Sequence, residues 1–139
     1  MKTTFDLETL MFQILNTPEV TDTINGGVYK SGDRPDDSEL EDVEINTIDL
    51  TTDSLPQIAT TNVNCYVPDE RVQMNGKMQY KKRRRRLESI AKVVLAVLKK
   101  NAGKRIDGCI YSIQAQTTLN LTEIHQHNVN IRISWNIQK

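Results

Sequence analysis

Two stretches near the C-terminus alternate apolar and polar residues strictly enough to constrain most of the architecture. Successive side chains of a strand point to opposite faces, so such alternation predicts a strand with one buried face. Ile58 to Val67 repeats the pattern, Val43 to Leu50 is rich in β-branched residues, and Val28-Tyr29 begins a shorter extended piece. The apolar positions of the two C-terminal strands are Cys109, Tyr111, Ile113 and Ala115, then Val129, Ile131, Ile133, Trp135 and Ile137.

Two other segments place apolar residues at helical spacing. The first predicts a short amphipathic helix that ends before Pro18, because proline removes a donor and restricts the residue before it. The second predicts a long helix from about Lys81 to Lys100, with Gly103 just past its end. The two apolar stripes are Phe5, Leu7, Leu10, Met11, Ile14 and Leu15, and Leu87, Ile90, Ala91, Val94, Leu95 and Leu98.

The order of these elements predicts an α+β fold. We expect an antiparallel or mixed sheet of four to five strands with two helices packed on one face, in a single domain covering residues 1–139. Residues 31–42, the acidic loop, are too polar to bury themselves. Residues 68–80 contain Asn75-Gly76, but no long alternating runs flank this pair, which favours a long loop over a tight hairpin.

A formal net charge of zero hides a strong division between the two halves of the chain. Residues 1–79 hold 15 acidic and 5 basic residues, whereas residues 80–139 hold 3 acidic and 13 basic ones. Such asymmetry indicates either an acidic segment folded over a basic one or charge meeting charge between neighbouring subunits.

The residues that could carry metal chemistry form incomplete sets. Glu123, His125 and His127 would share one face of a strand, but two solvated histidines at a strand start fit the pattern better than a zinc or nickel site. The carboxylates of the acidic loop could hold magnesium for a nuclease, yet no second carboxylate cluster lies on a strand. Cys65 and Cys109 lie in apolar runs typical of buried free thiols. We therefore expect no metal, no cofactor and no enzymatic activity.

The sharpest local signal is a run of six consecutive cations, the basic run. Cations at a helix N-terminus oppose the macrodipole, which indicates a partner for them. That partner could be DNA, the acidic loop of the same chain or the acidic loop of a neighbouring subunit. A small nucleic-acid-binding protein is thus the alternative function, although few aromatic residues accompany the run. The basic run consists of Lys81, Lys82, Arg83, Arg84, Arg85 and Arg86.

The chain resembles the tail-completion or tail-terminator proteins of long-tailed bacteriophages and prophages. Gly26-Gly27-Val28-Tyr29, after a short helix, is similar to the family's G-x-I-Y start of its sheet, and a polar loop with Arg34-Pro35 follows. Asn62 to Val67 looks like the family's V-x-V-x-C-Y strand. The helix over Arg84 to Lys100 and a closing strand ending at Trp135-Asn136-Ile137 complete the resemblance.

The resemblance implies a structural subunit that performs no chemistry. Such subunits form a ring, commonly of six, which caps the finished tail tube and presents a surface to the head connector. The expected partners are copies of the chain, tail-tube and connector proteins, and DNA passing through the lumen, with no membrane. No apolar stretch is long enough for a span and no signal sequence is recognisable, so we expect the chain to be cytoplasmic where it is made. The resemblance implies assembly in the host cytoplasm and residence in the virion.

The predicted interface follows from the charge division. Its basic side is the basic run, facing a neighbouring subunit or DNA in the lumen. Its acidic side consists of Asp33, Asp36, Asp37, Glu39, Glu41 and Asp42.

Overall fold

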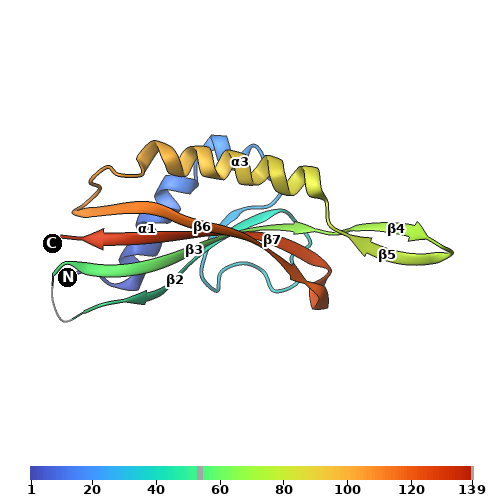
Figure 1. Ribbon diagram of the computed structural model, residues 1–139, viewed down its shortest axis with the longest axis horizontal. Helices are drawn as coiled ribbons and strands as arrows, with labels where there is room; N and C mark the ends of the chain where they lie inside the picture. The colour runs from blue at the N-terminus through green and yellow to red at the C-terminus, as the bar shows by residue number, and fades with distance from the viewer. Residues whose placement is uncertain (53–54, 139) are drawn as a thin grey trace.

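The computed structural model describes residues 1–52 and 55–138. Its elements follow the predicted order of helix, strands, long helix and strands (Figure 1). The helices are α1 (Thr4–Leu15), α2 (Pro18–Thr21), α3 (Arg84–Asn101) and a 3₁₀ turn, η1 (Thr122–Ile124). The strands are β1 (Val28–Lys30), β2 (Asp42–Leu50), β3 (Gln57–Pro68), β4 (Glu70–Met74), β5 (Lys77–Lys81), β6 (Cys109–Leu121) and β7 (Gln126–Ile137).

Five of the strands form one sheet in the order β1-β2-β3-β7-β6. β1 runs parallel to β2, whereas all other neighbours are antiparallel, so the sheet is mixed. α1 and α3 lie over one face of it, as Figure 1 shows for α3. The predicted α+β class and the two helices on one face are therefore confirmed, with α2 as a short additional helix.

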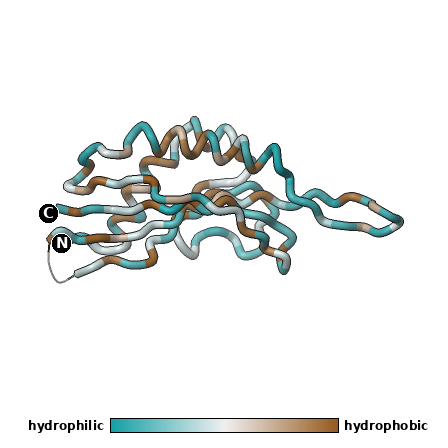
Figure 2. Tube along the Cα trace, viewed as in Figure 1, coloured by the Kyte–Doolittle hydropathy of each residue, from teal (hydrophilic) through white to brown (hydrophobic). Residues whose placement is uncertain are grey.

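The core lies between this face and the two helices. Val63 pairs with Ile45 on one side and Ile131 on the other, and all three side chains are fully buried. Burying each such side chain contributes about 1.5–3 kcal/mol. Trp135 is 1% exposed and donates from Nε1 to Thr61 Oγ1 at 2.9 Å, so its one polar atom is satisfied. Figure 2 shows the apolar segments crossing in the middle of the body.

α1 begins at a capping box. Thr3 Oγ1 accepts from the Asp6 backbone N–H at 3.2 Å, and the Asp6 carboxylate accepts from the Thr3 N–H at 2.7 Å. Leu7, Met11 and Leu15 of the predicted stripe are fully buried. Phe5 belongs to the predicted stripe but not to the core, since it is 77% exposed on the first turn of α1.

α3 starts three residues later than the sequence pattern predicts. Lys81 is the last residue of β5, and the helix begins at Arg84. The predicted stripe packs as expected, and Val97 adds to it, because it shares the face of Val94 and Leu98. No helix of the described residues is both long enough and apolar enough to cross a membrane.

The prediction of a long loop at 68–80 is wrong. β4 and β5 form an antiparallel hairpin that projects from the end of the body (Figure 1). Asn75 and Gly76 both have positive φ, 52° and 76°, as a type I′ turn requires. The Asn75-Gly76 turn was sufficient to predict the pairing. The strands show no long alternating runs because the hairpin does not pack on the core, so neither strand needs an apolar face. Figure 2 shows it largely hydrophilic.

Candidate functional site

The basic run spans three structural elements. Lys81 ends β5, Lys82 and Arg83 connect it to the helix, and the last three arginines form the first turn of α3. Arg83 is the N-cap residue and provides no side-chain cap, and no acidic residue lies in the first turn. The helix start is therefore positive by its dipole and by its side chains. Lys81 through Arg85 are exposed.

Arg86 differs from the rest of the run because it binds within the subunit. Its Nε and Nη2 donate to the two carboxylate oxygens of Glu41 at 2.7 and 2.6 Å, and Nη2 also donates to the Thr23 carbonyl at 2.7 Å. The Glu41 side chain is 9% exposed. This bidentate pair holds the pKa of Glu41 below its ordinary value. One acidic and one basic residue of the predicted interface are thus paired inside the fold.

The acidic loop is held by Arg34, whose side chain is 9% exposed. Its Nε donates to Asp42 Oδ2 at 2.8 Å, and its Nη2 donates to Gln126 Oε1 at 2.9 Å. Its Cζ lies 4.0 Å from the centroid of the Tyr66 ring. Asp42 is fully buried and also accepts from Ser38 Oγ at 2.5 Å. Asp42 therefore faces the loop itself and presents no charge outward.

Gly26 and Gly27 close this network from the other side. The Gly27 N–H donates to Asp42 Oδ1 at 2.9 Å, and the Gly26 N–H donates to the Glu41 carbonyl at 2.9 Å. A Cβ on Gly26 would lie 1.9 Å from Asp42 Oδ1, so only glycine allows this approach. The two glycines thus allow the Asp42 carboxylate to pack against the backbone and to accept a hydrogen bond from it.

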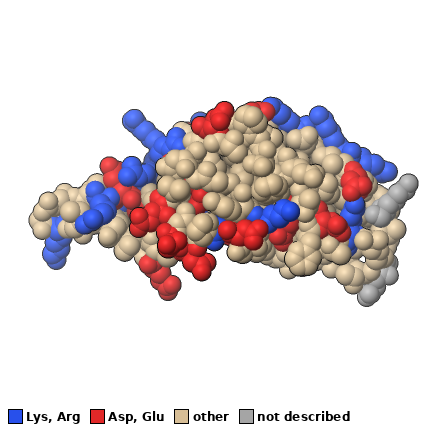
Figure 3. All heavy atoms as spheres, turned by 180° about the vertical axis from the view of Figure 1, so that it is seen from behind, with Lys and Arg blue, Asp and Glu red and all other residues tan. Residues whose placement is uncertain are grey.

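Four carboxylates of the acidic loop remain exposed after these pairings. They lie at the end of the sheet face that the helices leave uncovered, because Arg34 stacks on Tyr66 and Tyr66 points away from the core. Figure 3 shows Asp and Glu side chains gathered below the base of the hairpin, whereas Lys and Arg predominate along the upper edge, where α3 lies, and on the hairpin. The exposed set is Asp33, Asp36, Asp37 and Glu39.

The sequence pattern did not identify Arg34 and Gln126 as the residues that hold the loop. Arg34 is the single cation of the acidic loop, among six carboxylates. This pattern could have indicated that Arg34 pairs with one of them, since a buried charge requires an opposite partner. Gln126 gave no signal, because it lies 92 residues from Arg34 in the sequence and only the fold brings them together.

The two histidines do not share a strand face. His125 follows the η1 turn with φ 53° and stacks on Tyr80 of the hairpin, with ring centroids 3.7 Å apart. His127 lies on β7 and its Nδ1 is 2.6 Å from Asp69 Oδ1. The left-handed residue interrupts the strand, and the two rings contact different partners. They fasten the base of the hairpin to the body, and the expectation of two solvated histidines is wrong for His127, whose side chain is 13% exposed.

The remaining reactive residue types are placed for packing. No group of three or more potential metal ligands occurs within residues 1–52 and 55–138. Cys65 and Cys109 are free and buried, as predicted. Burial raises the pKa of the Cys65 thiol to about 12, so it stays protonated and is a poor nucleophile.

Comparison with known proteins gives a structural match. No protein-family model and no curated protein sequence matches the chain. A chain of the solved structure described as "Virion of native gene transfer agent (GTA) particle" superposes with a TM-score of 0.56 at 9% sequence identity. The match covers 96% of this chain and 95% of the other, so the two share a fold over nearly their whole lengths.

Proposed function

We propose that the chain is a structural subunit of a phage or prophage virion, a tail-terminator or tail-completion protein that forms a ring at the head–tail junction. The observation that carries this proposal is the fold that it shares, end to end, with a chain from a gene transfer agent virion. The residue patterns that resemble the tail-terminator family point to the same class. This subunit would act by binding its neighbours and would perform no chemistry.

The charged surfaces support assembly by head-to-tail contacts. A ring of identical subunits needs two different surfaces that complement each other on every copy. The exposed carboxylates of the acidic loop lie on the sheet face away from the helices, and the basic run begins α3 on the covered face. Charge pairs of this kind mainly fix the orientation and register of subunits, with less effect on affinity.

The hairpin supports the same proposal. A two-stranded hairpin is only marginally stable alone in water, and this one is fastened to the body mainly at its base, by the Tyr80–His125 stack. It exposes Met74, Met78 and Tyr80 at 44%, 51% and 41%. Such an arm is suited to burial against another subunit or another virion protein.

Reversing the exposed charges of the basic run should abolish assembly while leaving the fold intact. The variant replaces Arg83, Arg84 and Arg85 with glutamate, and cells that lack the native gene but express it should produce heads and tails that do not join. Glutamates at a helix N-terminus interact favourably with the dipole, so the variant should fold at least as well as the wild type. Electron microscopy of the particles and circular dichroism of the purified chain measure both effects.

A control with the same change in charge lies at and just beyond the other end of α3. Replacing Lys99, Lys104 and Arg105, all exposed, with glutamate should leave joined particles at the wild-type level. Complete particles that form without any copy of the chain would overturn the proposed function. Joined particles with the Arg83–Arg85 variant would instead remove the basic run from the interface.

Nucleic-acid binding is the second candidate, favoured by the five exposed cations from Lys81 to Arg85. If these bind phosphates, the affinity of the purified chain for duplex DNA should fall steeply with salt. A plot of the logarithm of the binding constant against the logarithm of the salt concentration should have a slope of about −0.9 for each phosphate neutralised. The Arg83–Arg85 glutamate variant should then lose binding. Fluorescence anisotropy at low salt tests this, and no detectable binding of the wild type would exclude this function.

A further inference from the structure

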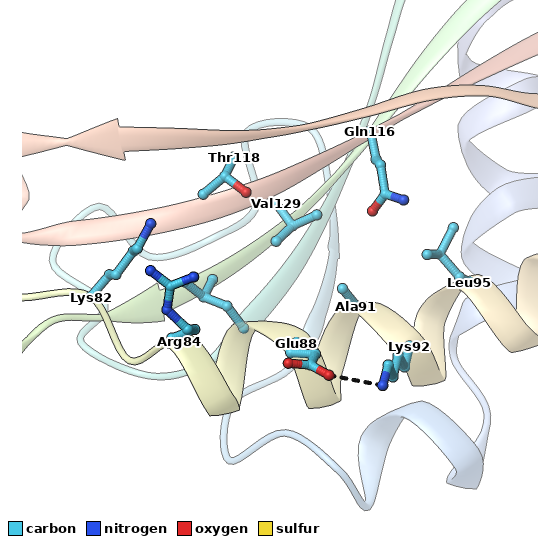
Figure 4. Close-up of a pocket in the computed structure, with 10 residues that line it drawn as sticks. Lys82, Arg84, Glu88, Ala91, Lys92, Leu95, Gln116, Thr118 and Val129 are labelled. Atoms are coloured by element: carbon cyan, nitrogen blue, oxygen red, sulfur yellow. Dashed lines mark ion pairs between the residues drawn. The ribbon is translucent and has the colours of Figure 1, made fainter.

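The helix-covered face contains a groove between α3 and the outer strand β6 (Figure 4). Its volume is about 460 Å³, within the range of about 300–1,000 Å³ found for binding clefts. At the far end of α3 the two elements touch, since Tyr111 Oη donates to the Leu98 carbonyl at 2.5 Å. Toward the start of α3 they enclose the groove instead. Its apolar floor consists of Leu87, Ala91, Leu95 and Val129.

The rim of this groove is positive. Lys82 and Arg84 reach toward the strand from the start of α3, and Lys92 stands further along the helix (Figure 4). Glu88 is the one acidic group of the lining and lies 2.8 Å from Lys92 Nζ. Arg84 and Arg86 belong to opposite sides of the helix, because two residues correspond to about 200° of rotation. Arg86 binds the subunit's own Glu41, and Arg84 faces the groove.

β6 forms the other wall and is an open sheet edge. Natural proteins usually protect such edges with charges, prolines or short strands. β6 is 13 residues long, and its sequence from Cys109 to Leu121 contains no charged residue and no proline. Gln116 and Thr118 point from it into the groove (Figure 4). The strand is thus left available for another chain.

The acidic loop has the complementary chemistry. Its four exposed carboxylates are accompanied by Leu40, which is 48% exposed beside them. Arg34 holds the loop in place through Asp42 and Gln126, so little conformational entropy would be lost on docking. The loop therefore presents an exposed leucine surrounded by carboxylates, and the groove presents an apolar floor surrounded by cations. The two surfaces are complementary in both charge and polarity.

The loop cannot reach the groove of its own subunit. It connects β1 to β2 and extends across the sheet to Gln126 on β7, the strand next to β6. The loop nevertheless lies on the uncovered face and the groove on the helix-covered one, so the sheet itself separates them.

We propose that the α3–β6 groove receives the acidic loop of a second copy of this chain, with Leu40 on the apolar floor and the carboxylates against Lys82, Arg84 and Lys92. The inference rests on the proposed ring, and it names the surfaces that close it. Because the loop and the groove are two different surfaces on opposite faces of the sheet, repetition of the contact is head-to-tail and allows a ring to close.

Disulfide trapping tests the contact directly. Glu39→Cys combined with Thr118→Cys, in the full chain, should give a ladder of covalent oligomers in steps of 15.9 kDa under mild oxidation. Both positions are exposed, and the native cysteines are buried. The matched control combines Glu39→Cys with Thr117→Cys, whose side chain points to the opposite face of β6. We expect at least tenfold more crosslinked product from the first pair.

The experiment separates the groove from the proposed function. It is run on the concentrated chain and on particles assembled with the variant. Rings or particles that contain the variant but give no ladder, or equal ladders from the Thr118 and Thr117 pairs, would overturn the docking proposal and leave the ring intact. A chain that neither self-associates nor enters particles would overturn the proposed function. Loss of the ladder on adding Leu40→Asp would support the docking proposal further.

Discussion

Replacing Asp42 with alanine should lower the free energy of unfolding by about 3–5 kcal/mol, because it leaves a buried cation without its partner. The Arg34 side chain is 9% exposed, and Asp42 is its carboxylate. The same substitution removes the acceptor for the Gly27 N–H and the Ser38 hydroxyl. Urea unfolding followed by the fluorescence of Trp135, the single tryptophan, measures the change.

Two further variants show whether the ion pair is the cause. Asp36→Ala removes an exposed charge from the same loop and should change the free energy of unfolding by less than about 0.5 kcal/mol. Adding Arg34→Ala to Asp42→Ala should cause much less loss than the sum of the two single changes. A loss below about 1 kcal/mol for Asp42→Ala would contradict the described network.

Arg86→Ala should lower the free energy of unfolding by about 1–3 kcal/mol, less than Asp42→Ala. It removes three hydrogen bonds and leaves Glu41, whose side chain is 9% exposed, without a cation. The effect is smaller because the Arg86 side chain is 40% exposed and solvent screens part of the pair. Alanine at Arg83, Arg84 or Arg85 should change stability by less than about 0.5 kcal/mol each. Chemical denaturation of the four variants makes the comparison, and equal losses would contradict it.

The same pair gives stability a dependence on pH. Arg86 holds the pKa of Glu41 below its ordinary value, so the folded state binds this proton less readily than the unfolded chain. The stabilisation is therefore complete above the ordinary carboxyl pKa and is lost as the pH falls through the lowered, folded-state pKa. The wild type should lose more stability than Arg86→Ala on acidification, and parallel stability–pH curves would contradict this.

The fold could be predicted for the strands and helices that bury one face, because burial imposes a periodic pattern of apolar residues. β3, β7, the first residues of β6 and the stripes of α1 and α3 follow from apolar periodicity, because these segments pack against the same core. The predicted alternation of β6 fails at Ala115, which is exposed after a register shift between Ile113 and Ala115. The hairpin was missed because its strands pack on no core, and only the Asn75-Gly76 turn indicated it. The start of α3 was misplaced for a related reason, since a run of cations has no periodicity to mark a boundary.

The sequence shows the charge division, but it does not show which charged residues pair within the subunit and which remain exposed. Sequence alone placed the carboxylates in one loop and the cations at one helix start, because long polar runs cannot be buried. Only the fold decided that Arg86 binds Glu41, 45 residues away, and which of the carboxylates in its own loop Arg34 binds. Only the fold, likewise, put the remaining charges on opposite faces of the sheet. Ion pairs act over a few ångströms, and in this chain the sheet topology sets those distances.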